Sequence, residues 1–249
     1  MDGAVDLNAD VGEVDDPRML ETELIKVVSS ANIATGAHAG NPSVMDAAVA
    51  LASAIGVRVG AHPSYPDRAG FGRRVIEMSP EALRAELLAQ VGALDAIARS
   101  RGSTVSHIKP HGALYHEVVM DTECARIVAE VAREFEGTML VVPATAQASF
   151  AGEGAPRILA EAFADRGYRA DGGLVSRGEP GDLLTDPQAA ATQAVSIARD
   201  KRVRAIDGSW LSVRADTICL HGDTPGALEI ACAVRAALES AGLRVCSPV

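Results

Sequence analysis

The sequence predicts an α/β fold in which seven parallel strands alternate with helices around a barrel. Short apolar runs alternate with longer stretches of helical periodicity, which is the order that a parallel β/α fold requires. The 249 residues suit one large α/β domain, and no Gly/Ser linker, charge block or fixed-period repeat divides them. We therefore interpret residues 1–249 as a single domain.

Seven apolar runs have the length of buried strands, and each precedes a segment with helical periodicity. In chain order, the predicted strands cover residues 5–9, 32–35, 58–61, 105–109, 139–142, 158–162 and 217–220.

The clearest predicted helix covers residues 79–101. Ser79 can cap its amino end, and Pro80 suits the first helical position. One face of this helix is apolar: Leu83, Leu87, Val91, Leu94 and Ala98. The other predicted helices cover residues 17–30, 42–56, 121–136, 144–150, 186–201 and 225–242.

One long irregular stretch covers residues 167–187. Its DGG, GEPGD and TDP segments are turn signals, and a loop of this length in a compact domain is typically a lid or a binding element. Because it follows the sixth strand, we expect it to lie over the mouth of the barrel.

The composition favours a protein that acts on small molecules. The chain carries 23 Lys and Arg against 33 Asp and Glu, a formal net charge of −10, and no basic cluster, which argues against a nucleic-acid surface. No apolar stretch approaches the roughly 20 residues of a membrane span, so we expect no membrane partner and a cytoplasmic location. We interpret the cysteines as reduced structural thiols because no CxxC spacing occurs: Cys124, Cys219, Cys232 and Cys246.

Polar side chains collect where the predicted strands end. Asn8 and Asp10 share one side of the first strand, and Glu13 follows on its loop. The carboxyl ends of parallel strands share one face of the fold, so residues that are far apart in sequence converge there. Five histidines lie at such ends, most of them beside glycine: His38, His62, His107, His111 and His221.

Lys109 ends an apolar strand, where lysine requires a carboxylate or an anionic ligand. A structural salt bridge and an anion site are equally good interpretations. Together with Asp10, Glu13 and the histidines, Lys109 supplies a base, an acid and a cation in one place. Two histidines are expected outside this set: His107 as a packed core residue and His116 as a surface residue.

A divalent metal is a further possibility at this face, because a carboxylate with histidines at strand ends is a common zinc site. The candidate ligands are Asp10, His38, His62 and His111, although no HxH or HExxH spacing supports them. The nucleotide motifs GxxxxGK[ST] and GxGxxG are absent, so any nucleotide site is unconventional or lies on another subunit.

Six ordered motifs resemble the LamB/YcsF family: DLNADVGE, SANIATGAHAGNP, VGAHPSYPDRAGFGRR, IKPHGALYH, EAFADRGY and HGDTPGA. The resemblance covers nearly the whole chain. It implies a seven-stranded, incomplete TIM-like β/α barrel, similar to the glycoside hydrolase/deacetylase superfamily. It also implies ATP-dependent opening of 5-oxo-L-proline to L-glutamate together with PxpB-like and PxpC-like subunits. The ATP site could then lie on this chain, on these partners or at their junction.

On this interpretation Asp10 or Glu13 is the base that activates water or the ring amide, and Lys109 neutralises developing negative charge. His111 joins them as a candidate proton carrier. Arg177 in the long loop is a candidate for the substrate carboxylate. The remaining candidate substrate-binding residues are Asn8, His38, His62 and His221.

Two other functions compete with this interpretation. A metal-dependent hydrolase or deacetylase of an N-acyl or cyclic amide substrate would hold a divalent metal tightly and act without ATP. A non-catalytic binding subunit would bind a small acid even without Asp10 and Glu13, and these residues would not affect turnover.

Overall fold

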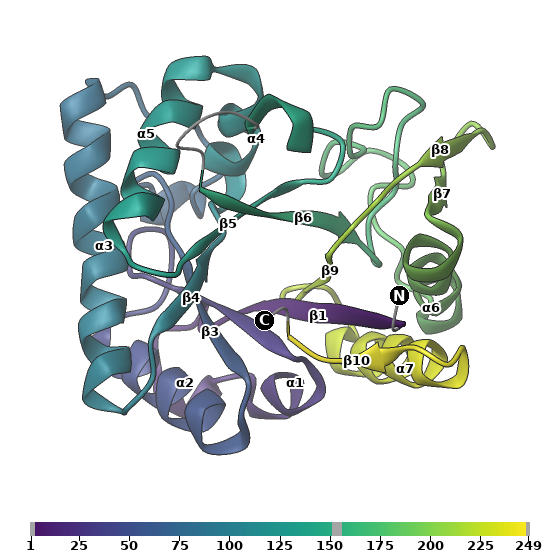
Figure 1. Cartoon of the computed structure of the whole chain (residues 1–249), viewed down its shortest axis with the longest axis horizontal. Coiled ribbons are helices and arrows are strands. Elements are labelled where there is room, and N and C mark those ends of the chain that lie inside the picture. Colours follow the sequence, from purple (N-terminus) through teal and green to yellow (C-terminus); the bar gives the residue numbers. More distant parts are fainter. Residues whose placement is uncertain (1–2, 151–155, 248–249) are drawn as a thin grey trace.

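Seven parallel strands close into a barrel in the computed structural model, which describes residues 3–150 and 156–247 (Figure 1). The strands are β1 (Ala4–Val11), β2 (Ser30–Ala34), β3 (Arg58–His62), β4 (Val105–Ile108), β5 (Met139–Pro143), β6 (Arg157–Phe163) and β9 (Thr217–His221). Each of the first six pairs with the next, and β9 pairs with both β6 and β1, which closes the ring. All seven predicted strands are confirmed, with ends that differ by a few residues.

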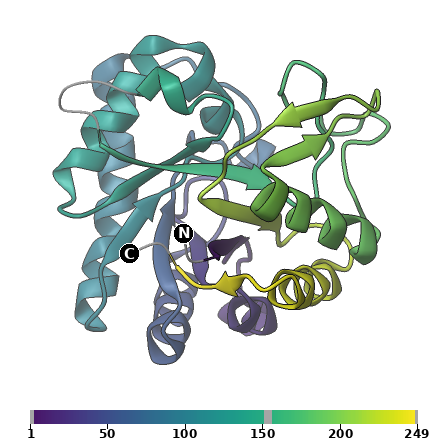
Figure 2. The same cartoon turned by 45° about the vertical axis from the view of Figure 1, so that its right-hand side comes forward.

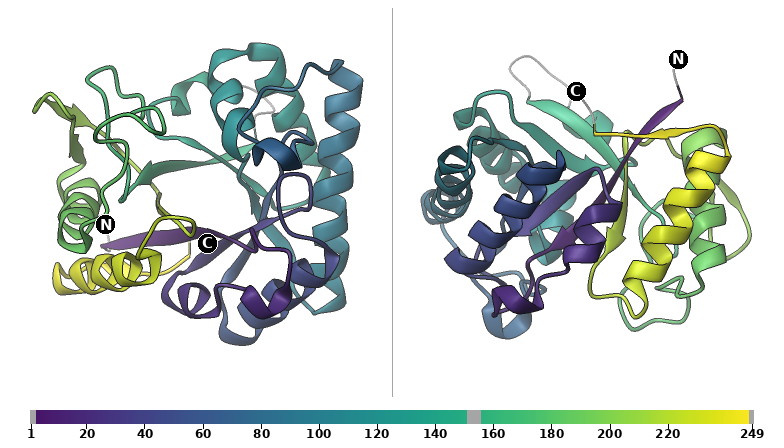
Figure 3. Two further views of the ribbon diagram at one scale, coloured as in Figure 1. Left: turned by 180° about the vertical axis from the view of Figure 1, so that it is seen from behind. Right: turned by 90° about the horizontal axis from the view of Figure 1, so that it is seen from below.

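Helices surround the barrel on its outer side. They are α1 (Thr22–Val27), α2 (Pro42–Ile55), α3 (Pro80–Ser100), α4 (Gly112–Met120), α5 (Thr122–Glu134), α6 (Pro187–Val195) and α7 (Ala227–Ser240). Figure 1 shows α3 along one flank and α6 and α7 along the opposite flank, and Figure 3 shows the helices outside the strands from behind and from below. Ser79 caps α3 by accepting a hydrogen bond from the Ala82 N–H, as predicted. None of the described helices has the length and apolar character needed to cross a membrane.

The barrel wall is apolar outside and polar inside. Along β1, Leu7, Ala9 and Val11 pack into the main core that the helices cover. The alternate residues face the other way, because side chains of a strand alternate between its two sides. Asp6 accepts hydrogen bonds from Ser30 and Thr217, both on strands that flank β1. This polar interior confirms the predicted common side of Asn8 and Asp10.

Two predicted helices are wrong in part. Residues 17–30 form one 3-10 turn, η1 (Pro17–Met19), followed by the short α1, because the backbone is extended at Leu20 and β2 already begins at Ser30. Residues 144–150 form turns and the 3-10 helix η3 (Gln147–Phe150) instead of an α-helix. Seven residues without an amino-terminal cap do not offset the cost of helix nucleation.

One α-helix and three short strands were not predicted from the sequence. Helix α4 begins directly after His111, and β10 (Arg244–Val245) adds to the edge of β1. The antiparallel hairpin of β7 (Arg202–Arg204) and β8 (Trp210–Ser212) projects beside α6 (Figure 2). The predicted helix over residues 186–201 ends in the π-helical turn η4 (Ser196–Asp200). All four cysteines are free thiols. Cys124 and Cys219 are buried, as expected of structural thiols, whereas Cys232 is exposed and Cys246 is half-buried.

Candidate functional site

A cavity of about 540 Å³ opens at the carboxyl ends of the strands. The strand-end residues Asp10, His62, Lys109, Glu161 and His221 line it. The loop of residues 172–177 lines it as well, which confirms the prediction that the long irregular stretch lies over the mouth of the barrel. Polar groups that are far apart in sequence therefore meet in one cavity, as the parallel topology predicts.

Lys109 lies at the base of this cavity, between two carboxylates. Its Nζ atom is 2.8 Å from Asp10 Oδ1 and 3.1 Å from Glu161 Oε1. A third contact, of 2.9 Å, joins Nζ to Cys219 Sγ, so each ammonium proton has a partner. The salt bridge foreseen for Lys109 is confirmed, and the same ammonium also faces the cavity.

The charges of this buried group stabilise one another. Burial alone would raise the pKa of Asp10, but its contacts with His62 and with the Lys109 ammonium hold it well below its usual value. Burial would lower the pKa of Lys109, yet Asp10, Cys219 and Glu161 raise it well above its usual value. Asp10 is therefore ionised and Lys109 protonated at neutral pH.

A layer of amide and imidazole groups holds this cluster from inside the barrel. Asn8 donates to Glu161 Oε1 and Thr217 Oγ1, and it does not line the cavity. Asn32 donates to Asp10 Oδ1 and accepts from His107 Nε2. His107 is buried, which confirms the expectation of a packed histidine, whereas His116 is exposed.

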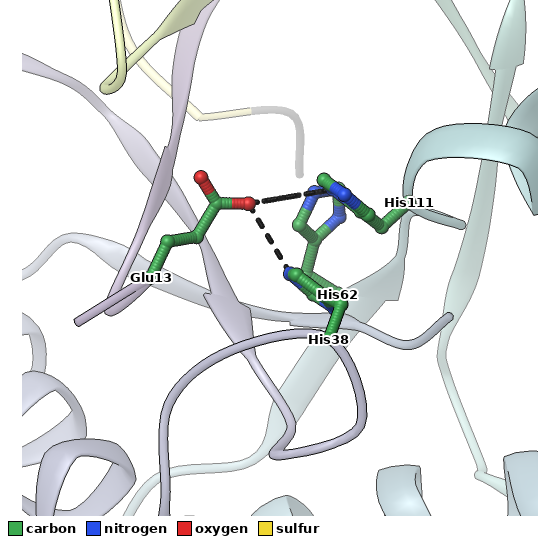
Figure 4. A group of neighbouring side chains, drawn as sticks. All are labelled: Glu13, His38, His62 and His111. Carbon is green, nitrogen blue, oxygen red and sulfur yellow. Dashed lines mark hydrogen bonds and ion pairs between the residues drawn. The ribbon is translucent and has the colours of Figure 1, made fainter. Parts of the chain in front are cut away.

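Three histidines and Glu13 form a second cluster beside Asp10. His38 follows β2, His62 ends β3, and His111 is the residue before α4 (Figure 4). Glu13 Oε1 lies 3.2 Å from His38 Nε2 and 3.3 Å from His111 Nδ1, and the rings of His38 and His111 stack at 3.8 Å.

The position of Glu13 depends on Gly12, whose φ of +71° turns the chain at the end of β1. The side chains that converge are therefore Glu13, His38, His62 and His111. The sequence had predicted Asp10 as the carboxylate of this group, and the structure has Glu13 there. Asp10 lies next to this set, with Oδ2 3.4 Å from His62 Nε2.

His221 is oriented by a buried carboxylate. Its Nδ1 atom lies 3.0 Å from Asp165 Oδ1, and its ring stacks on Phe163. Burial would raise the pKa of Asp165, but the charge and hydrogen bonds of His221 and the hydroxyl of Thr224 lower it below the usual value. Because Asp165 engages Nδ1 and the residue lines the cavity, Nε2 is the ring nitrogen available for proton transfer.

Two arginines lie at the rim of the cavity around one acidic residue. Arg73 Nη2 is 2.7 Å from Asp223 Oδ2, and Arg177 Nη2 is 3.8 Å from Asp223 Oδ1. The structure therefore brings Arg177 to the cavity, as expected of a carboxylate-binding residue. Asp223 sets the position of both guanidinium groups.

Three residues of the site were missed in the sequence. Glu161 is a charged residue inside an apolar strand run, the same signal that identified Lys109. Asp165 lies four residues further on in the same EAFADRGY motif. Cys219 was interpreted as a structural core thiol, and its contact with Lys109 has no sequence signal.

Comparison with known proteins identifies the family. Residues 5–249 match the model of the LamB/YcsF family. The chain belongs to the LamB/YcsF family. A relative from Chloroflexus aggregans, named as the A subunit of 5-oxoprolinase, is 49% identical over 250 residues, covering 98% of this chain and 99% of the relative. A protein of the same name from Thermococcus onnurineus is 46% identical over 245 residues, covering 97% and 96%.

A solved structure has the same fold. The lactam utilization protein from Thermus thermophilus superposes with a TM-score of 0.90 at 43% identity, covering 98% of this chain and all of that one. The seven-stranded TIM-like barrel expected from the resemblance is thus confirmed. The motifs that predicted LamB/YcsF membership carry the cavity residues, including Asp10, His62, Lys109, Glu161 and His221.

Proposed function

We propose that this chain is the A component of an ATP-dependent 5-oxoprolinase and that the lactam binds in the cavity above Lys109. The observation that carries the proposal is the buried Asp10, Lys109 and Glu161 cluster at the base of a cavity, in a chain 49% identical to a protein named as the A subunit of 5-oxoprolinase. The cluster places ionised groups where a small polar ring can contact them.

The cavity offers complementary groups for 5-oxo-L-proline. Arg177 at the rim suits the carboxylate of the substrate, since a guanidinium binds carboxylates with paired hydrogen bonds. Deeper in the cavity wall, the Tyr115 hydroxyl and Glu161 Oε2 are buried without a hydrogen-bond partner among the described residues. These two atoms would pair with the ring carbonyl and the ring N–H.

Coupling to ATP follows from the stability of the lactam amide. Transfer of the γ-phosphoryl group to the ring carbonyl oxygen releases ADP and makes the ring carbon electrophilic. Water then adds to that carbon, the C–N bond breaks as the nitrogen takes a proton, and an acyl phosphate remains. A second water hydrolyses the acyl phosphate to give L-glutamate and phosphate.

Within this sequence Asp10 is the base for the attacking water, because Lys109 and Asn32 hold it ionised in a fixed position. Lys109 offsets the negative charge that develops at the ring oxygen. His221, held by Asp165, is placed to deliver the proton to the leaving nitrogen. Glu13 and His111 lie beside this reaction centre and take no proton in these steps.

The test is release of L-glutamate from 5-oxo-L-proline by this chain mixed with PxpB-like and PxpC-like subunits, with each protein and ATP omitted in turn. We expect activity only in the complete mixture, and a loss of at least about 100-fold for Asp10→Asn. Asp207→Asn, in an exposed turn, is the matched control and keeps full activity. No release by an assembled complex, or release without ATP, would reject the proposal.

A further inference from the structure

The three histidines beside Glu13 all have their outer ring nitrogen engaged by an acceptor. His62 Nδ1 lies 2.7 Å from the Lys109 carbonyl oxygen, and His111 Nε2 lies 2.9 Å from the Phe71 carbonyl oxygen. A carbonyl oxygen can only accept, so both of these nitrogens carry the proton. In a neutral ring the other nitrogen, His62 Nε2 or His111 Nδ1, then has a lone pair.

His38 is fixed in the same way by a hydroxyl group. Its Nδ1 lies 3.0 Å from Ser64 Oγ, and that hydroxyl already donates its proton to the Tyr65 carbonyl oxygen at 2.7 Å. Ser64 Oγ therefore accepts from His38 Nδ1, and His38 Nε2 carries a lone pair. Partners outside the cluster thus fix each of the three imidazoles in a single tautomer. Proteins orient the histidine ligands of a metal in this way.

The three lone pairs and the Glu13 carboxylate converge on one point (Figure 4). His62 Nε2 and His111 Nδ1 are 2.9 Å apart, which places two acceptors in contact. Glu13 Oε1 faces His38 Nε2 at 3.2 Å and His111 Nδ1 at 3.3 Å, again acceptor against acceptor. A single proton cannot relieve all of these contacts at once, whereas one central cation relieves every one.

From this arrangement we propose that Glu13, His38, His62 and His111 bind one divalent transition-metal ion, with zinc as the best fit. The donors are three imidazole nitrogens and one carboxylate oxygen, a set that zinc prefers. A tetrahedral zinc with bonds of about 2.0–2.1 Å holds its donors about 3.3 Å apart. One donor atom from each residue lies within 4.8 Å of all the others, so only small side-chain movements are required.

Charge and access support the same ion. Asp10 and Glu161 share the single ammonium of Lys109, whereas Glu13 faces only imidazole rings among the described residues, so a divalent cation would supply the positive charge beside Glu13. The four side chains are at most 9% exposed, so this is a buried site and not a chance grouping on the surface. His62 and His111 also line the cavity, so the ion would lie next to a molecule bound there.

This inference does not depend on the lactam being the substrate, because it concerns metal binding by the isolated chain. The chain would be freed of metal with a chelator, loaded with Zn²⁺ or Co²⁺ alone, and analysed for metal content. We expect about one ion per chain, a Co²⁺ absorption spectrum of a nitrogen and oxygen site, and a higher melting temperature with metal.

Four variants separate this site from its alternatives. Glu13→Gln and His62→Ala should each weaken Zn²⁺ binding by at least about 10-fold, and His116→Ala at the exposed histidine should bind as the wild type does. Asp10→Asn should retain the ion, because Asp10 is not one of the four proposed ligands. Variants that bind zinc equally, loss of zinc in Asp10→Asn with retention in Glu13→Gln, or a folded wild type that holds no ion would overturn the proposal.

Discussion

His221 Nδ1 lies 3.0 Å from Asp165 Oδ1 and 3.1 Å from Asp165 Oδ2, in a position where the imidazole also stacks on Phe163. The carboxylate is buried and also accepts hydrogen bonds from the His221 N–H and the Thr224 hydroxyl. It therefore fixes both the ring orientation and the ring tautomer of His221, and Nε2 faces the reaction.

Asp165→Asn should lower kcat of the reconstituted enzyme by about 10- to 100-fold, with little change in KM, since the substituted amide no longer enforces one tautomer. Asp207→Asn serves as the control at an exposed turn. A kcat equal to that of the wild type would show that His221 does not depend on this carboxylate.

Lys109→Met should destabilise the chain by about 3–5 kcal/mol, because it leaves the buried carboxylates of Asp10 and Glu161 without their cation. Adding Glu161→Gln to Lys109→Met should recover part of this loss, since one of the two uncompensated charges is removed. Urea unfolding of the wild type, both single variants and the double variant measures the coupling. Strictly additive effects would show that Lys109 and Glu161 do not interact.

The sequence predicted the convergence of the site but not its internal contacts. Asp10, His62, Lys109 and His221 could be placed together because each lies at the carboxyl end of a parallel strand, and the topology brings such ends to one face. Glu161 was within reach of the same reasoning. Strand residues alternate in direction, so a charge at this position of β6 had to face either the barrel interior or the apolar helix layer.

The tautomers of the histidines could not be predicted. His111 is fixed by the carbonyl oxygen of Phe71, a residue with φ of +55° that lies 40 positions earlier in the chain. Such a contact depends on how the loop after β3 folds back on α4, and no residue pattern encodes that path. The sequence also could not show that Glu13, and not Asp10, joins the three histidines. Lys109 and Asn32 engage Asp10, and these contacts depend on the folded barrel.

Acidification should destabilise the protein in part through His107. Burial, followed by the Lys109 charge, lowers the pKa of His107 to about 3. Between the unfolded value of about 6.5 and this folded value, only the unfolded chain takes up the proton, so stability falls as the pH falls through this window. His107→Gln keeps a donor for Asn32 but cannot titrate.

The cost of His107→Gln should therefore be about 2 kcal/mol smaller at pH 5 than at pH 7. Urea unfolding in the presence of a chelator measures this without a contribution from bound metal. His116→Gln, at the exposed histidine, should change less between the two pH values. A cost of His107→Gln that is the same at both pH values would show that His107 is not held neutral by the fold.

Gly72→Ala should weaken metal binding without touching a ligand. Gly72 has a φ of +65°, and a Cβ at this position would lie 2.8 Å from His111 Cδ2 and 3.0 Å from His38 Cβ. Both rings would have to move, and displaced ligands typically cost about 10- to 100-fold in metal affinity. Gly56→Ala is the matched control, because Gly56 has a φ of +77° but no atom within 4 Å of the added Cβ.

Both alanine variants should lose about 1 kcal/mol of stability through the left-handed backbone alone. Only Gly72→Ala should also bind Zn²⁺ more weakly in a titration of the metal-free protein, because only this substitution presses on His38 and His111. Equal zinc affinities in the two variants would mean that the positions of these imidazoles do not set the affinity. That result would contradict the proposed site of Glu13, His38, His62 and His111.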